Sequence, residues 1–216
     1  SEFAGTEFAE AALIRGLPTD FSRARLLDDL AGYRVRLPVS PLRDRMLGEP
    51  EFLVKPVAES RVREWEVSRC GLVSAFQRLE ARGIDFAEVA SRLRYSFSHT
   101  EGVALAMVAV FPAAGGFGVD LESLGREISD AAFARFHRPS ELSLLSDRLD
   151  YWVLKEAAYK AHPRSAETVV ADFEITGRGP GEDEILLASR KGTTETFRAR
   201  LGTIDEFRYA FAVPLD

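Results

Sequence analysis

The feature of the sequence that most limits its possible folds is a nearly continuous apolar run at residues 103–111, Val-Ala-Leu-Ala-Met-Val-Ala-Val-Phe. A run of this length predicts a strand that is buried on both faces, and it is far shorter than the roughly 20 residues that span a bilayer. Residues 117–122, Phe-Gly-Val-Asp-Leu-Glu, alternate apolar and acidic side chains. We expect them to return beside the run as the second strand of a hairpin.

Two other segments carry the spacing of amphipathic helices. Apolar side chains recur every three or four residues across 59–82, and Gly83 follows at a position that suits a helix end. A second helix is predicted over 147–161. Further strands are predicted at 168–175, 184–189, 194–201 and 206–213. Helices mixed with mainly antiparallel strands make the expected fold class α+β.

Composition excludes several classes of protein. The chain has 216 residues, of which 46% are hydrophobic, enough for one compact domain or two small halves. Its 28 basic and 34 acidic side chains give a net charge of −6, which argues against a nucleic-acid partner. The single cysteine, Cys70, excludes internal disulfides and Cys-rich zinc sites. The first six residues carry no basic leader segment, so we expect a soluble, cytoplasmic protein with no membrane partner.

The acidic pair Asp120 and Glu122 is the first candidate for chemistry. Two carboxylates at alternate positions of a strand project from one face, where they repel each other and favour a bound cation. Carboxylate oxygens suit magnesium, which also accepts oxygens from a substrate phosphate. The alternative interpretation is a solvated outer face of a hairpin.

The predicted helix at 147–161 adds a second candidate group. Trp152, Glu156 and Lys160 follow one another at four-residue spacing and therefore share one stripe of the helix. One interpretation is an ordinary surface ion pair between Glu156 and Lys160. The other is a third carboxylate for the metal, with an ammonium group that neutralises phosphate.

The segment Ser98-His99-Thr100 lies just before the buried strand and offers donors to a phosphate, or it is simply a polar strand end. His137 and His162 have no companions at metal-ligand spacing and are interpreted as surface residues. The chain has no Gly-x-Ser-x-Gly elbow, no Walker loop and no Gly-x-Gly-x-x-Gly motif.

Taken in order, three of these segments resemble the 4′-phosphopantetheinyl transferases. They are Ser98-His99-Thr100, Gly-Val-Asp-Leu-Glu at 118–122, and Trp-Val-Leu-Lys-Glu-Ala-Ala-Tyr-Lys-Ala at 152–161. Upstream, Arg61 and Arg69 resemble the arginines of a helix of that family. The likeness covers about residues 61–161. It is closest to the monomeric branch that modifies carrier proteins of polyketide, peptide and siderophore synthesis.

The resemblance implies a pseudo-twofold duplication of two similar α+β halves, with mainly antiparallel sheets and the active site in the cleft between them. The halves would be residues 1–111, with the arginine helix and the Ser-His motif, and residues 112–216, with the metal and catalytic residues. A weak internal echo agrees with duplication: Trp65 precedes Arg69 by four residues, as Trp152 precedes Glu156. A monomer is expected.

The resemblance also implies an activity. The enzyme moves the 4′-phosphopantetheine arm of coenzyme A to a serine of an acyl or peptidyl carrier protein and releases adenosine 3′,5′-bisphosphate. Glu156 would take the serine proton, directly or through a water, and Lys160 would stabilise charge on the phosphate. The implied magnesium ligands are Asp120, Glu122 and Glu156, and the implied contacts to coenzyme phosphates are Arg61, Arg69, Ser98, His99 and Lys160.

The chain departs from the family at residues 81–94, which lack the usual Gly/Pro/Trp-rich segment. This departure motivates an alternative, a catalytically inactive module of the same fold that binds coenzyme A or a carrier protein. Asp120, Glu156 and Lys160 also resemble the acidic residues and lysine of metal-dependent nuclease sites, but the acidic charge balance argues against that function. Carrier proteins are acidic too, so docking needs a local basic or apolar patch.

Overall fold

A computed structural model describes residues 8–39, 41–111, 116–141, 144–181, 183–190 and 195–215 of the chain. The chain forms two compact units, Ser1–Ala114 and Gly115–Asp216. The sequence-based division lies between residues 111 and 112. A turn is expected at residues 112–116, of which 112–115 lie outside the described residues.

The first unit contains a three-stranded antiparallel sheet in the order β1-β3-β2. Its strands are β1 (Phe8–Arg15), β2 (Leu93–Thr100) and β3 (Val103–Val110). The apolar run is the central strand β3, paired on both edges and buried along most of its length. Glu101 and Gly102, with φ of 47° and 76°, join β2 to β3 in a two-residue turn.

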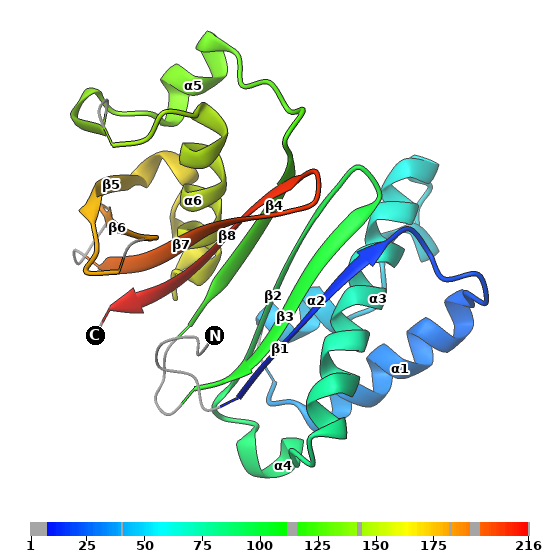
Figure 1. Cartoon of the computed structure of the whole chain (residues 1–216). Coiled ribbons are helices and arrows are strands. Elements are labelled where there is room, and N and C mark those ends of the chain that lie inside the picture. Colours follow the sequence, from blue (N-terminus) through cyan, green and yellow to red (C-terminus); the bar gives the residue numbers. More distant parts are fainter. Residues whose placement is uncertain are drawn as a thin grey trace. The chain divides into compact units, whose positions relative to one another are not determined.

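Helices of the first unit cover one face of that sheet. The long helix α3 (Glu59–Ala81) contacts all three strands, and α1 (Arg23–Arg36) packs on α3 (Figure 1). The prediction of a helix over 59–82 is confirmed, including its end, where Gly83 has a φ of +81°. The shorter elements are α2 (Pro41–Leu47), η1 (Glu51–Leu53) and α4 (Phe86–Val89).

The second unit contains a five-stranded antiparallel sheet in the order β4-β8-β7-β6-β5. Its strands are β4 (Gly118–Ser123), β5 (Phe173–Arg178), β6 (Glu184–Ser189), β7 (Thr196–Ile204) and β8 (Phe207–Leu215). Helix α6 (Arg148–Ala161) packs against this sheet and begins at its N-cap residue Asp147, as predicted (Figure 1). The remaining elements are α5 (Asp130–Phe136), η2 (Pro139–Glu141), η3 (Ser165–Glu167) and η4 (Val170–Asp172).

The predicted hairpin of residues 103–111 and 117–122 is wrong. Strand β3 pairs with β1 and β2, whereas β4 pairs with β8 at the edge of the other sheet. The buried run needs a partner on each of its edges, and both come from its own unit. The strand predicted at 168–175 begins only at Phe173, because Asp172 closes a short 3₁₀ turn by accepting from the Val169 amide at 2.9 Å.

The α+β class and the antiparallel sheets are thus confirmed. The two units have sheets of three and five strands, and the pseudo-twofold duplication stays a prediction. Within the described segments, no helix has both the length and the apolar character that a membrane crossing requires.

Candidate functional site

The candidate site lies inside the second unit, where strand β4 meets helix α6. The two elements approach each other closely because β4 begins with Gly118. A Cβ at this position would lie 2.0 Å from the carbonyl oxygen of Ala157 and 2.7 Å from the amide nitrogen of Ala161. Glycine is therefore required here, because the backbone of α6 occupies the space that a side chain would need.

Close packing at Gly118 places Asp120 beside Lys160. The Asp120 carboxylate is buried, with 3% of the residue exposed, and its Oδ1 pairs with Lys160 Nζ at 2.7 Å. The same ammonium group donates to the carbonyl of Val119 at 3.2 Å, so two acceptors on β4 hold it in place.

The second carboxylate of the pair, Glu122, is buried as well, with 7% of the residue exposed. Its Oε1 accepts a hydrogen bond from Trp152 Nε1 at 3.0 Å and also pairs with Arg126 Nη1. The Arg126 guanidinium lies over the Trp152 ring, with 5.1 Å from Cζ to the ring centroid. Sequence reasoning missed Arg126, because four-residue spacing predicts contact only within a helix, whereas Glu122 lies on β4 and Arg126 in the turn that follows it.

These contacts decide between the alternatives left open by the sequence. A solvated outer face for Asp120 and Glu122 is wrong, because both side chains are buried and contact α6. In the described structure Lys160 pairs with Asp120 and not with Glu156, so the ordinary helix-surface pair is also wrong.

Glu156 is the half-buried carboxylate of the cluster. Within the described residues it makes no hydrogen bond and no ion pair. Burial raises its pKa to about 7; Lys160 and Arg126 oppose this rise, and the negative charges of Asp120 and Glu122 add to it. A carboxylate with such a pKa can accept a proton near neutral pH.

The chemistry of this donor set fits a hard divalent cation. Three carboxylates act electrostatically on one another, and oxygen ligands are what magnesium prefers. Two of the three are paired in the structure, Asp120 with Lys160 and Glu122 with Arg126. Among the residues described, no three His, Cys, Asp or Glu side chains are arranged to hold a metal ion. The magnesium site therefore stays a prediction.

The other predicted site residues lie in the first unit. Arg69 is buried and donates to the carbonyl oxygens of Met46 and Arg45, at 3.2 and 3.4 Å, and to Ser68 Oγ at 3.0 Å. Its guanidinium lies 4.5 Å from the centroid of the Phe97 ring, and burial lowers its pKa to about 10. Arg69 thus fastens the end of α2 to α3.

The three remaining predicted residues of the first unit, Arg61, Ser98 and His99, differ in exposure and in the direction of their side chains. Arg61 is exposed in the first turn of α3. On β2, Ser98 is buried and His99 is exposed. Neighbouring residues of a strand project to opposite faces, so the two side chains of the Ser-His motif do not share one face.

The interpretation of His162 as a surface residue is wrong. It is buried against the rings of Phe173 and Phe197, and its Nδ1 accepts from the Arg164 amide at 3.0 Å. His137 is half-buried and stacks on the Phe133 ring.

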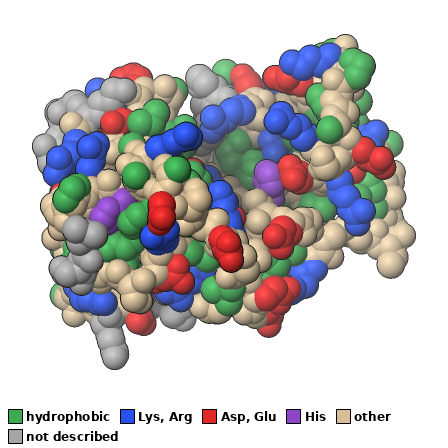
Figure 2. Space-filling view, turned by 90° about the horizontal axis from the view of Figure 1, so that it is seen from above, with side chains coloured by type: hydrophobic (Ala, Val, Ile, Leu, Met, Phe, Trp, Pro, Cys, Tyr) green, Lys and Arg blue, Asp and Glu red, His purple; other side chains and the backbone are tan. Residues whose placement is uncertain are grey.

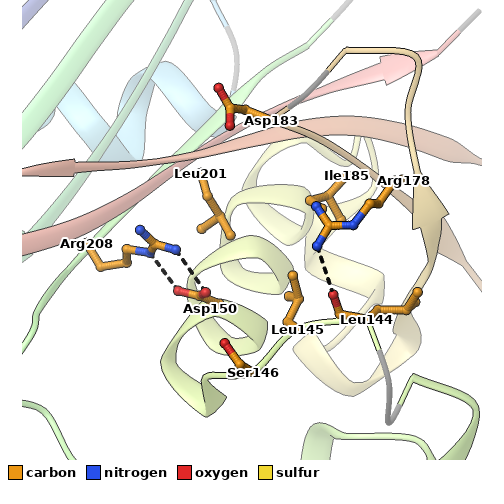
Figure 3. Close-up of a pocket in the computed structure, with 9 residues that line it drawn as sticks. All are labelled: Leu144, Leu145, Ser146, Asp150, Arg178, Asp183, Ile185, Leu201 and Arg208. Carbon is orange, nitrogen blue, oxygen red and sulfur yellow. Dashed lines mark hydrogen bonds and ion pairs between the residues drawn. The ribbon is translucent and has the colours of Figure 1, made fainter.

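A separate pocket of about 520 Å³ lies in the second unit near the start of α6 (Figure 3). It is lined by Leu144, Leu145, Ser146, Asp150, Arg178, Asp183, Ile185, Leu201 and Arg208. None of the predicted site residues is among them. Inside it, Arg208 of β8 makes two bonds to the Asp150 carboxylate, at 2.6 and 2.8 Å, and so ties α6 to the sheet two residues before Trp152.

No protein-family model matches the chain, and no curated protein shows significant similarity to it.

Proposed function

We propose that this protein is a 4′-phosphopantetheinyl transferase, a cytoplasmic monomer that moves the 4′-phosphopantetheine arm of coenzyme A to a serine of a carrier protein. The observation that carries the proposal is the environment of Glu156. This carboxylate is half-buried, has a pKa raised to about 7, and lies among Asp120, Glu122 and Lys160. The order of the three motifs along the chain supports the same reaction.

In the proposed reaction the nucleophile comes from the partner. The serine Oγ forms a bond to the phosphorus that carries the pantetheine arm, and the bond from that phosphorus to the bridging oxygen breaks. Adenosine 3′,5′-bisphosphate leaves with that oxygen. The serine proton passes to Glu156, directly or through one water, and the pKa of Glu156 suits this role at neutral pH.

Lys160 would meet the negative charge that develops on the transferred phosphate. Its ammonium group is held by Asp120 and by the carbonyl of Val119, so its position is set before substrate binds. Preorganised charge of this kind stabilises a transition state without reorganisation at the moment of reaction.

Asp120, Glu122 and Glu156 are the residues that would hold magnesium. When bound, the ion would neutralise the pyrophosphate and improve its leaving group. Arg61, Arg69, Ser98 and His99 are proposed for the coenzyme phosphates on the resemblance alone. Arg69 is buried, whereas Arg61 and His99 are exposed, so we expect Arg61 and His99 to make the direct contacts.

The test is intact-mass spectrometry of several apo carrier proteins after incubation with this protein, coenzyme A and magnesium. We expect a gain of one phosphopantetheine that a chelator abolishes. Glu156→Gln and Asp120→Asn should each lower the rate by at least about 100-fold, the size of a lost general base or a lost electrostatic contact. Glu167→Gln, an exposed change in the same unit, is the matched control and should retain the full rate.

A different result would favour the alternative. If no carrier gains mass although coenzyme A binds in calorimetry, the protein is a binding module of the same fold. A Glu156→Gln variant with the rate of the unchanged protein would remove Glu156 from the mechanism.

A further inference from the structure

We propose that Arg126 is an internal countercation of Glu122, which a divalent metal ion displaces when it binds. The inference rests on the proposed function in one respect, namely that Glu122 is a metal ligand. It adds a regulatory element that the resemblance does not assign: metal entry and release of the Arg126 guanidinium are one coupled event.

The geometry of Arg126 is specific. It follows strand β4 in a turn where its amide donates to the Ser123 carbonyl at 3.0 Å. From this turn its Nη1 reaches back to Glu122 Oε1, and its guanidinium covers the Trp152 ring at 5.1 Å. Trp152 Nε1 donates to the same carboxylate oxygen at 3.0 Å. The indole therefore fixes the direction of the Glu122 carboxylate while the arginine supplies its positive charge.

The two cations of the site differ in how firmly they are held. Lys160 has 25% of its side chain exposed and adds a backbone acceptor to its pair with Asp120. Arg126 has 41% of its side chain exposed, and among the described residues its ion-pair partner is Glu122 alone. When the Arg126 guanidinium moves away from Glu122, it enters water that already reaches it, so none of its donors is left buried without an acceptor.

Electrostatics makes the two cations compete at Glu122. A metal ion bound to this carboxylate would lie within a few ångströms of the Arg126 guanidinium, where like charges in a partly buried site repel strongly. Metal affinity is therefore lowered by the free energy of the Arg126–Glu122 pair. By linkage, removing the arginine raises that affinity. For a partly exposed pair the expected gain is about 3- to 10-fold.

The experiment is a magnesium titration by isothermal calorimetry, with neither coenzyme A nor carrier protein present. It compares the unchanged protein with Arg126→Gln, Arg126→Lys and Arg148→Gln. Arg148 is a close match for Arg126, because it also pairs with a carboxylate, Asp130, and covers an aromatic ring, Phe133. We expect tighter magnesium binding for Arg126→Gln alone; Arg126→Lys, which keeps the charge, and Arg148→Gln should match the unchanged protein.

Tryptophan fluorescence gives a second readout. Magnesium should change the emission as the guanidinium leaves the Trp152 ring, and this change should be absent in Trp152→Phe and strongly reduced in Arg126→Gln. Thermal unfolding confirms that each variant is folded.

Equal magnesium affinity of Arg126→Gln and the unchanged protein overturns the proposal and leaves the metal site standing. Absence of magnesium binding in all variants also overturns it, since no metal ion is then present to displace Arg126 from Glu122. The carrier-protein mass assay decides the proposed function independently of either outcome.

Discussion

Glu156 shows how neighbouring residues change the chemistry of one side chain. Glu167 is exposed in the same unit, whereas Glu156 is half-buried among two other carboxylates. Its protonated form is therefore favoured in the folded protein and not in the unfolded chain. This difference makes the stability of the metal-free protein depend on pH.

We predict that metal-free protein loses stability as pH rises through about 7. The folded-state pKa of Glu156, about 7, lies above its ordinary value of 4.5. The contribution of the protonated group is complete below pH 4.5 and is lost as pH rises through 7. The loss is at most about 3 kcal/mol, since one pKa unit corresponds to about 1.4 kcal/mol and Glu156 is partly solvated.

Urea unfolding between about pH 5 and pH 8 measures this effect. Glu156→Gln should flatten the profile, and Glu167→Gln should leave it unchanged. A profile that keeps its slope in Glu156→Gln would assign the titration to another group.

Sequence reasoning located Asp120, Glu122, Glu156 and Lys160 but not their pairing. Four-residue spacing on a helix makes Glu156 and Lys160 neighbours, yet it contains no information on which strand packs against that stripe. Strand β4 comes close enough for Lys160 to bind Asp120. The role of Arg126 could not be predicted for a similar reason, because its contact with Trp152 arises only when the turn after β4 folds back over that ring.

At the scale of elements, the site depends on how closely β4 and α6 pack. Gly118 permits this contact, because a Cβ there would lie 2.0 Å from the Ala157 carbonyl oxygen. Gly118 of the motif therefore has a steric role. Because Gly118 and Asp120 are two positions apart on β4, both lie on the same face of the strand.

Gly118→Ala should separate β4 from α6 and destabilise the protein by about 1–3 kcal/mol, the usual cost of overpacking. The proposed transferase activity should fall further than stability, because the Asp120–Lys160 pair is pulled apart. Gly177→Ala in β5 is the control, since a Cβ there would meet nothing within 4 Å. Chemical unfolding and the mass assay measure the two effects. Equal behaviour of the two variants would contradict the steric role.

A buried ion pair elsewhere on α6 fixes the helix to its surroundings. Lys155 and Glu141 are fully buried and lie 2.8 Å apart, and Lys155 also donates to the Phe136 carbonyl at 2.6 Å. Glu141 accepts further from the amides of Arg138 and Ile175, at 2.7 and 2.5 Å. The pair thus joins η2, β5 and α6.

Lys155→Met should destabilise the protein by about 3–5 kcal/mol, because it leaves the Glu141 carboxylate buried without its cation. Arg148→Met, which breaks an exposed pair, should cost less than about 1 kcal/mol. Urea unfolding compares the two. A loss for Lys155→Met as small as that of Arg148→Met would show that Glu141 takes up a proton or finds another partner.

The predicted elements with strong periodicity, α3, α6 and β6, are confirmed nearly to the residue. Strand pairing was less predictable. Residues 103–111 and 117–122 are neighbours along the chain, but the partners of β3 include β1, which lies about ninety residues earlier. The periodicity of a segment predicts which of its residues are buried, but it does not predict which distant strand pairs with it.

The whole molecule consists of two units, each with its own sheet and its own buried core. The division into functional halves between residues 111 and 112 stays a prediction, and β1 and α1 of the first unit were not predicted. Strand β1 is a short stretch of mixed polar and apolar residues, whereas α1 buries Leu26, Leu30 and Tyr33 at the four- and three-residue spacing of a helix, a signal that sequence reasoning missed. Strand β1 becomes regular through contact with β3.

Net charge is also a property of the whole molecule. It amounts to −6, and on the face drawn in Figure 2 basic and acidic side chains are interspersed. An acidic carrier protein therefore meets a repulsive long-range field.

We predict that kcat/KM for an acidic carrier protein rises as salt increases from about 0.01 M to about 0.1 M, because the screening length falls from about 30 Å to about 10 Å. Steady-state rates at fixed magnesium and coenzyme A measure this. A carrier with its acidic residues neutralised serves as the control and should show little dependence. A steep fall with salt would instead indicate that a local basic patch dominates docking.

The close contact at Gly118 has a practical consequence for finding similar chains. Glycine at the start of the strand is required by space rather than by reactivity, because the backbone of α6 lies against it. A search pattern of Gly-x-Asp-x-Glu followed by Glu-Ala-x-x-Lys-Ala combines this steric requirement with the reactive groups. It can recognise the site in sequences whose overall similarity is too low for alignment.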